Sequence, residues 1–205
     1  MADDIVVKFD TRAAERFLQR LAGQQMPFAR AKALTMTAQD AQADVRASLY
    51  ERFTIRRPWV PGGIRITAAK KHDAVPFAEV GSRDEFMLKQ ETGGVKGPAP
   101  GKRTVAIPAG VRGSKRAIVP RVKWPAKLLA KPRTFITNLG GDTSGLIRMG
   151  SRNAGFKLLW VFKKSITLKP RFGFHDTVTA TVHRTWADNQ RKALIEAVRT
   201  ARPPR

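Results

Sequence analysis

Residues 92–175 contain eighteen Lys or Arg residues but only one acid, Asp142. This stretch supplies most of the chain's formal net charge of +23. Self-repulsion on this scale opposes folding into a compact body, and it is tolerated most easily when a polyanion or an acidic protein surface neutralises the charge. The stretch therefore predicts a negatively charged partner, either nucleic acid or a protein bound beside it. A basic surface that is simply solvated is the alternative.

The composition indicates a folded protein rather than a basic tail. With 205 residues, 42% of them hydrophobic, the chain can bury a core, and we expect one domain spanning residues 1–205. The absence of cysteine excludes disulfides and thiolate metal sites, which fits assembly in a reducing cytoplasm. Asp3 and Asp4 stand where a signal peptide would be basic, and the densest apolar run, residues 158–162, is too short to span a bilayer. We expect a soluble protein with no membrane partner.

The N-terminal part of the chain has the pattern of a long helix. A short strand at residues 5–9 and a first helix precede Gly23, which is expected to end that helix. Pro27 suits the first turn of a helix at residues 28–53, because its missing N–H falls among donors that have no intrahelical partner. The apolar residues recur at three- and four-residue steps and form an alanine-rich stripe, which predicts either a core face or a subunit contact: Phe28, Ala31, Leu34, Ala38, Ala41, Val45, Leu49 and Phe53.

Strands are expected in the middle of the chain and a helix at its end. Short apolar runs bounded by Pro and Gly predict strands at residues 64–70, 75–81, 104–108 and 156–168. The last of these is the strongest and is centred on Trp160, and a turn is expected before it at Gly140, Gly141 and Gly145. A final helix is expected at residues 176–200, where Trp186 is placed to share an apolar layer with Trp160.

Residues 96–133 carry eleven basic residues, six prolines and no acid. Because proline disfavours both helix interiors and central strands, this segment predicts an extended basic loop or arm. We expect residues 110–127 to be dispensable for folding of the body. The predicted fold class is α+β: long N- and C-terminal helices packed on a small, mainly antiparallel sheet, with an extended basic Pro/Gly-rich arm at residues 96–133.

Catalytic constellations are not evident in the sequence. Gly101 and Lys102 resemble the end of a P-loop, but position 96 is Lys96 instead of the required glycine. The three histidines, His72, His175 and His183, lack the spacing of metal ligands. We therefore predict no enzyme activity, no metal and no cofactor. A nuclease ranks last, because too few acids accompany the basic region to hold a divalent cation.

The basic arm contains the candidate functional residues. Cations spread along an extended backbone can follow a row of phosphates, which favours sequence-independent, salt-sensitive binding. Trp124 is expected either to stack on an exposed base or to anchor the arm to the protein. No recognition helix or RNA-binding aromatic motif indicates base-specific reading. The candidate contacts to nucleic acid or an acidic partner are Lys102, Arg103, Arg112, Lys115, Arg116, Arg121, Lys123, Lys127, Lys131 and Arg133.

Five short segments occur in order along most of the chain, before a C-terminal helix: Phe53-Thr54-Ile55-Arg56-Arg57, Ala68-Ala69-Lys70, Gln90-Glu91-Thr92-Gly93-Gly94, Val105-Ala106-Ile107-Pro108 and Leu159-Trp160-Val161-Phe162. This order resembles bacteriophage minor tail and tail-completion proteins of the minor tail protein Z type. Proteins of this kind are small, basic, cysteine-poor virion components at the head-proximal end of the tail. The resemblance implies a location and an assembly role, and it implies no site residues.

The resemblance implies a structural virion protein that acts in tail completion and head-tail joining. We expect a homo-oligomeric ring that contacts neighbouring neck and tail-tube proteins and the DNA end, because ring symmetry multiplies weak contacts. The expected location is the virion neck, with assembly in the host cytoplasm. The alternative is a sequence-independent nucleic-acid-binding protein.

Overall fold

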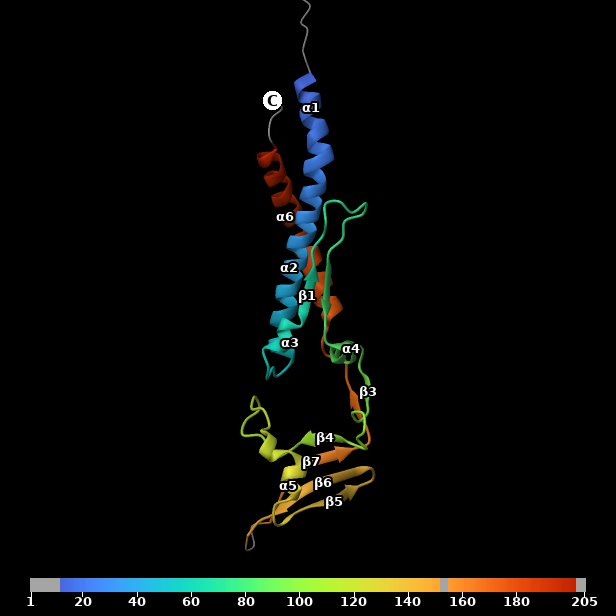
Figure 1. Cartoon of the computed structure of the whole chain (residues 1–205), viewed down its shortest axis with the longest axis vertical. Helices are drawn as coiled ribbons and strands as arrows, with labels where there is room; N and C mark the ends of the chain where they lie inside the picture. Colours follow the sequence, from blue (N-terminus) through green and yellow to red (C-terminus); the bar gives the residue numbers. More distant parts are fainter. Residues whose placement is uncertain (1–11, 152–154, 202–205) are drawn as a thin grey trace, which may run out of the picture. The chain divides into compact units, whose positions relative to one another are not determined.

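The computed structural model describes residues 12–151 and 155–201. Helices and short antiparallel strands make up the described chain, which confirms the α+β class (Figure 1). The strand expected at residues 5–9 lies outside the described residues. The chain divides into two compact units, each assembled from segments that are far apart in sequence. The first unit comprises residues 1–48, 63–83 and 174–205, and the second comprises residues 49–62 and 84–173.

Helices form most of the first unit. They are α1 (Arg12–Arg20), the π-helical turn η1 (Leu21–Gln25), α2 (Met26–Arg52) and α6 (Phe174–Thr200). Gly23 does not end a helix as expected, because it lies in the π-helical turn between α1 and α2. Pro27 is the second residue of α2, but it follows the π-helical turn directly, so it does not stand at the separate helix start that the sequence predicted. The final turn of α2, from Leu49, belongs to the second unit.

Small residues pack α2 against α6. Ala29 and Ala33 of α2 form a buried cluster with Ala193 and Ala197 of α6, and Trp186 and Leu194 pack against it. Alanines allow the two helices to approach closely, so apolar area is buried without large side chains. In the predicted stripe, Ala31, Ala38, Ala41, Val45 and Leu49 are buried within the chain, so most of the stripe is a core face. Phe28 is exposed, and Leu34 and Phe53 are partly buried.

Strands β1 (Ile64–Thr67) and β2 (Glu79–Ser82) pair antiparallel in the first unit. Their positions confirm the two strands expected after α2, with shorter bounds. The side chains of Gln42 and Arg46, one turn apart on α2, both donate hydrogen bonds to the buried carbonyl of Ile64, at 2.7 Å and 2.9 Å. These bonds fix the strand pair on α2, since they satisfy a backbone acceptor that would otherwise be costly to bury.

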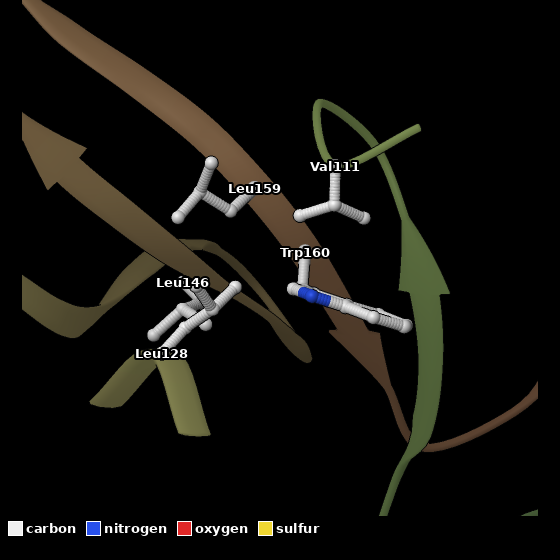
Figure 2. Close-up of a cluster of buried hydrophobic side chains, with 5 residues drawn as sticks. All are labelled: Val111, Leu128, Leu146, Leu159 and Trp160. Carbon is white, nitrogen blue, oxygen red and sulfur yellow. The ribbon is translucent and has the colours of Figure 1, made fainter. Parts of the chain in front are cut away.

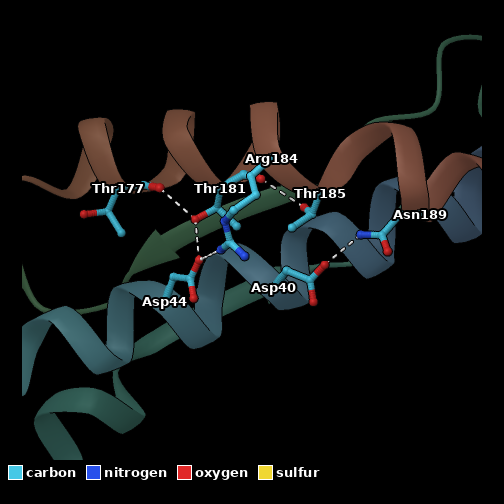
Figure 3. Close-up of polar contacts among 7 residues, drawn as sticks. All are labelled: Asp40, Asp44, Thr177, Thr181, Arg184, Thr185 and Asn189. Carbon is cyan, nitrogen blue, oxygen red and sulfur yellow. Dashed lines mark hydrogen bonds and ion pairs between the residues drawn. The ribbon is translucent and has the colours of Figure 1, made fainter.

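Polar side chains also join α2 to α6 (Figure 3). Asn189 is buried and its Nδ2 donates to Asp40 Oδ2 at 2.7 Å and to Thr37 Oγ1 at 3.2 Å. One helical turn away, the carboxylate of Asp44 accepts from the hydroxyl of Thr181 at 2.7 Å and pairs with Arg184. Because these partners must meet for the buried groups to be satisfied, the network fixes the register of the two helices.

We expect Asn189→Ala to destabilise the first unit by about 1–3 kcal/mol, because the buried Thr37 hydroxyl and the Asp40 carboxylate would lose a donor. Asp188→Ala is the matched control, since Asp188 is the preceding residue on α6 and only forms an exposed ion pair with Arg191 at 3.2 Å. Urea unfolding followed by circular dichroism measures both variants. Equal losses of stability would mean that the network does not hold the helices.

The second unit is mainly β-structure. Strand β3 (Gly94–Lys96) pairs with β8 (Ile166–Leu168), and four further strands form an antiparallel sheet in the order β4 (Val105–Pro108), β7 (Phe156–Lys163), β6 (Thr143–Met149) and β5 (Thr134–Gly140). The unit also contains the short helices α3 (Trp59–Gly62), α4 (Glu85–Thr92) and α5 (Pro125–Leu129) and the 3-10 turn η2 (Arg121–Lys123). The strand expected at residues 156–168 is therefore two strands, β7 and β8, in different sheets.

Trp160 lies in the core of the second unit (Figure 2). It faces Leu146 across the β6–β7 pair, and Val111 and Leu128 complete the buried cluster with Leu159. Leu159 and Trp160 are both buried although they are consecutive, because the β6–β7 register shifts by one residue at this point. Trp186 packs instead in the first unit, so the expected shared apolar layer is replaced by two separate clusters.

The basic segment at residues 96–133 is anchored to this core. Val111 and Leu128 are buried, and Trp160 Nε1 donates to the carbonyl of Lys123 at 3.0 Å. Deleting residues 110–127 would remove Val111 from this core, so the structure predicts that these residues are needed for folding, contrary to the expectation from the sequence. The buried residues Val111 and Leu128 lie 17 positions apart in a segment rich in cations and prolines, so they give no periodic signal in the sequence.

Candidate cationic interface

Positive charge is concentrated in the second unit. Its sequence contains 22 Lys or Arg and 5 Asp or Glu residues, a formal charge of +17, whereas the first unit contains 17 and 11, a formal charge of +6. Asp142, the single acid within residues 92–175, forms an exposed ion pair with Lys164 at 2.6 Å. This carboxylate is thus already engaged by one cation, and most of the positive charge of the unit is left for solvent or a partner.

All ten candidate contact residues are exposed on the second unit. They lie in the loop before β4, in the loop between β4 and η2, in η2 and α5, and in the turn before β5. Their order along these elements is Lys102 and Arg103, then Arg112, Lys115 and Arg116, then Arg121, Lys123 and Lys127, then Lys131 and Arg133. The backbone of the segment is held by the core, so these cations project from an anchored surface.

Arg56 joins this group, although it is not among the ten contact residues that the sequence indicated. Its Nε and Nη2 donate hydrogen bonds to the carbonyl of Lys115 at 3.1 Å and 2.9 Å. The side chain of Arg112 is exposed. Two effects lower the pKa of Arg112 from its ordinary value: partial desolvation is the larger, and repulsion from Arg56 is the smaller. Nothing in the sequence could have placed Arg56 here, since 59 residues separate it from Lys115.

The side chain of Trp124 is exposed on the surface of the same unit. Trp124 is the residue before α5, its side chain is 51% exposed, and the guanidinium of Arg121 lies 6.0 Å from its ring centroid. Trp160, rather than Trp124, anchors the segment to the core. Of the two roles expected for Trp124, the exposed ring fits stacking better than anchoring.

One face of the four-stranded sheet carries exposed apolar side chains. The pairing of Phe135 with Ile147 and of Met149 with Phe156 places these four residues on one face, opposite to that of Leu146 and Trp160. Met149 is 52% exposed and Phe156 is 71% exposed, while Ile147 between the strands is buried. Grouped apolar side chains of this kind mark interaction surfaces more often than isolated ones do.

His175 has a neighbouring carboxylate in the structure. His175 Nδ1 lies 3.8 Å from Asp176 Oδ1, and both side chains are exposed at the start of α6. Within residues 12–151 and 155–201, no group of three or more His, Asp or Glu side chains could hold a metal ion. None of the helices in this part of the chain is long and apolar enough to cross a membrane.

No known protein family, curated protein or solved structure matches the chain.

Proposed function

We propose that this chain is a structural virion protein of a tailed bacteriophage that acts at the head-proximal end of the tail, in tail completion and head-tail joining. It works as a homo-oligomeric ring that contacts neighbouring neck and tail-tube proteins and the DNA end. The resemblance of the five ordered segments to minor tail and tail-completion proteins supports this role.

The observation that carries the proposal is that the second unit has both an apolar surface and a strongly cationic surface. An apolar sheet face around Met149 and Phe156 suits contact with another protein, and the same unit carries a formal charge of +17 that suits an acidic partner or DNA. A protein that joins subunits beside a DNA channel needs both kinds of contact. Ring symmetry would repeat each weak contact, so that many shallow surfaces give a stable assembly.

A second function is favoured by one specific feature. The exposed ring of Trp124, with Arg121 beside it, could stack on a base in single-stranded nucleic acid. A monomer that binds nucleic acid without sequence preference would use this ring and the surrounding cations. The oligomeric state therefore separates the two functions.

We expect the purified full chain to form closed rings in mass photometry and negative-stain images. The double substitution Met149→Ser and Phe156→Ser should convert rings to monomers, because it removes the apolar side chains from the sheet face. Ile195→Ser is the control, since Ile195 is equally apolar and 61% exposed but lies on α6 of the first unit. A wild-type protein that stays monomeric at all concentrations and binds DNA tightly would overturn the ring and support the second function.

A further inference from the structure

We propose that Arg56 and the loop at residues 112–116 form a binding site for a phosphate group of the DNA backbone. The two parts come from distant segments of the second unit and are joined by the hydrogen bonds from Arg56 to the carbonyl of Lys115. This inference rests on the part of the proposed function that gives the second unit a DNA partner. It does not depend on ring formation.

The guanidinium of Arg56 is oriented before any ligand arrives. An arginine side chain carries five N–H donors in a rigid fork. The carbonyl of Lys115 takes one N–H from Nε and one from Nη2, at 3.1 Å and 2.9 Å, so three donors remain for another acceptor. A long side chain that is already held in place loses less conformational freedom when it binds, which favours affinity.

Three cations belong to this loop, and Arg56 is bonded to its backbone. Arg112, Lys115 and Arg116 are all exposed, and the loop from residue 109 to residue 120 contains no acid. None of the ion pairs formed by the described residues involves these three side chains or Arg56. The repulsion between Arg56 and Arg112, which contributes to the lowered pKa of Arg112, would be relieved by an anion bound between them.

The arrangement favours phosphate over carboxylate as that anion. A carboxylate accepts through two oxygens in one plane, which suits a single arginine fork. The tetrahedral phosphate group of a phosphodiester directs its oxygens out of a plane, so it can accept from Arg56 and from a side chain on the facing loop at once. The remaining candidate cations on the same unit would then engage neighbouring phosphates along the strand.

The test uses the full chain and a short fluorescent DNA duplex, with affinity measured by anisotropy between about 50 and 200 mM salt. Arg56→Gln and Arg112→Gln should each weaken binding and reduce the slope of log affinity against log salt by about 1, the value for one lost phosphate contact. Arg148→Gln is the control, because it removes one charge from an exposed strand residue of the same unit and should leave the slope nearly unchanged. Arg56→Lys keeps the charge but not the fork that bonds the carbonyl of Lys115, so it should bind more weakly than the wild type while keeping most of the salt slope.

Competition identifies the anion. Inorganic phosphate should displace the duplex from the wild type more effectively than acetate at equal ionic strength, and this difference should vanish in Arg56→Gln. Equal slopes for Arg56→Gln, Arg112→Gln and Arg148→Gln would overturn the site. Binding of polyglutamate that depends on Arg56 as strongly as DNA binding does, with phosphate no better a competitor than acetate, would assign the cluster to an acidic protein instead. Rings that form normally but do not bind DNA would overturn this inference and leave the assembly role standing.

Discussion

Trp160→Ala is expected to unfold the second unit under conditions in which the wild type is stable. Removing a buried aromatic side chain typically costs ~3–5 kcal/mol, a large part of the ~5–15 kcal/mol by which a domain is stable. Trp160 contacts the apolar cluster around Leu146 and donates to the carbonyl of Lys123, so the substitution would also leave that acceptor without its donor. Circular dichroism during urea unfolding measures the loss.

Two other tryptophan variants make the result specific. Trp160→Phe keeps most of the ring in the cluster and loses the indole N–H, so we expect a loss of about 1 kcal/mol. Trp124→Ala removes a half-exposed ring from the same unit and should change stability little. If Trp124→Ala and Trp160→Ala cost the same, Trp160 would not be the centre of the core.

Gly110→Ala should destabilise the second unit nearly as severely. The backbone N–H groups of Ala109 and Gly110 donate to the carbonyl of Leu159 at 2.9 Å and 3.2 Å. These two bonds hold the backbone of Ala109 and Gly110 against β7. A Cβ atom on Gly110 would lie 2.3 Å from the carbonyl oxygen of Leu158, a backbone atom that cannot rotate away. Strain of this kind typically costs about 1–3 kcal/mol, and here it would also displace Val111 from the cluster.

Gly113 provides the matched control for that prediction. It lies three residues further along the same loop, and a Cβ atom there would meet nothing within 4 Å. Gly113→Ala should therefore keep the wild-type melting temperature. Equal melting temperatures for the Gly110→Ala and Gly113→Ala proteins would show that the loop does not pack on β7 as described.

The helices were the most predictable part of the fold. The three- and four-residue spacing of apolar residues located α2 and α6, and the turn residues around residues 64–81 located β1 and β2. The sequence pattern predicted neither strand of the β5–β6 hairpin. It indicated only the turn at Gly140 and Gly141, and it wrongly included Gly145. Gly145 lies inside β6, where a Cβ atom would come within 2.6 Å of Leu139 and 2.9 Å of Leu158, so packing rather than turn geometry explains this glycine.

The division into two units could not be predicted from local sequence patterns. The chain passes between the units four times. The first crossing lies inside the continuous helix α2, where neither proline nor glycine marks it, whereas Gly62, Gly63 and Gly173 stand at two of the others. The polar network between α2 and α6 has a signature in the sequence. Asp40 and Asp44 on one helix, and Thr181 and Thr185 on the other, are each four residues apart and so lie on one helix face.

The candidate interface was predictable in composition but not in geometry. The excess of cations in the sequence identified ten candidate residues. All ten are exposed in the structure, because Lys and Arg side chains without nearby acids seldom find buried partners. The place of Arg56 beside the loop of Arg112 depends on a long-range hydrogen bond to Lys115, and no local pattern encodes it. Whether these residues contact DNA remains a prediction.

The most direct test of the proposed role is to look for the chain in purified virions of a tailed phage whose genome encodes it, which the proposal requires to exist. Immunogold labelling, followed by cryo-electron microscopy of the neck, should place a ring of this protein at the head-proximal end of the tail. Particles produced without the protein should accumulate as separate heads and tails. Complete, infectious virions that lack the chain would contradict the account.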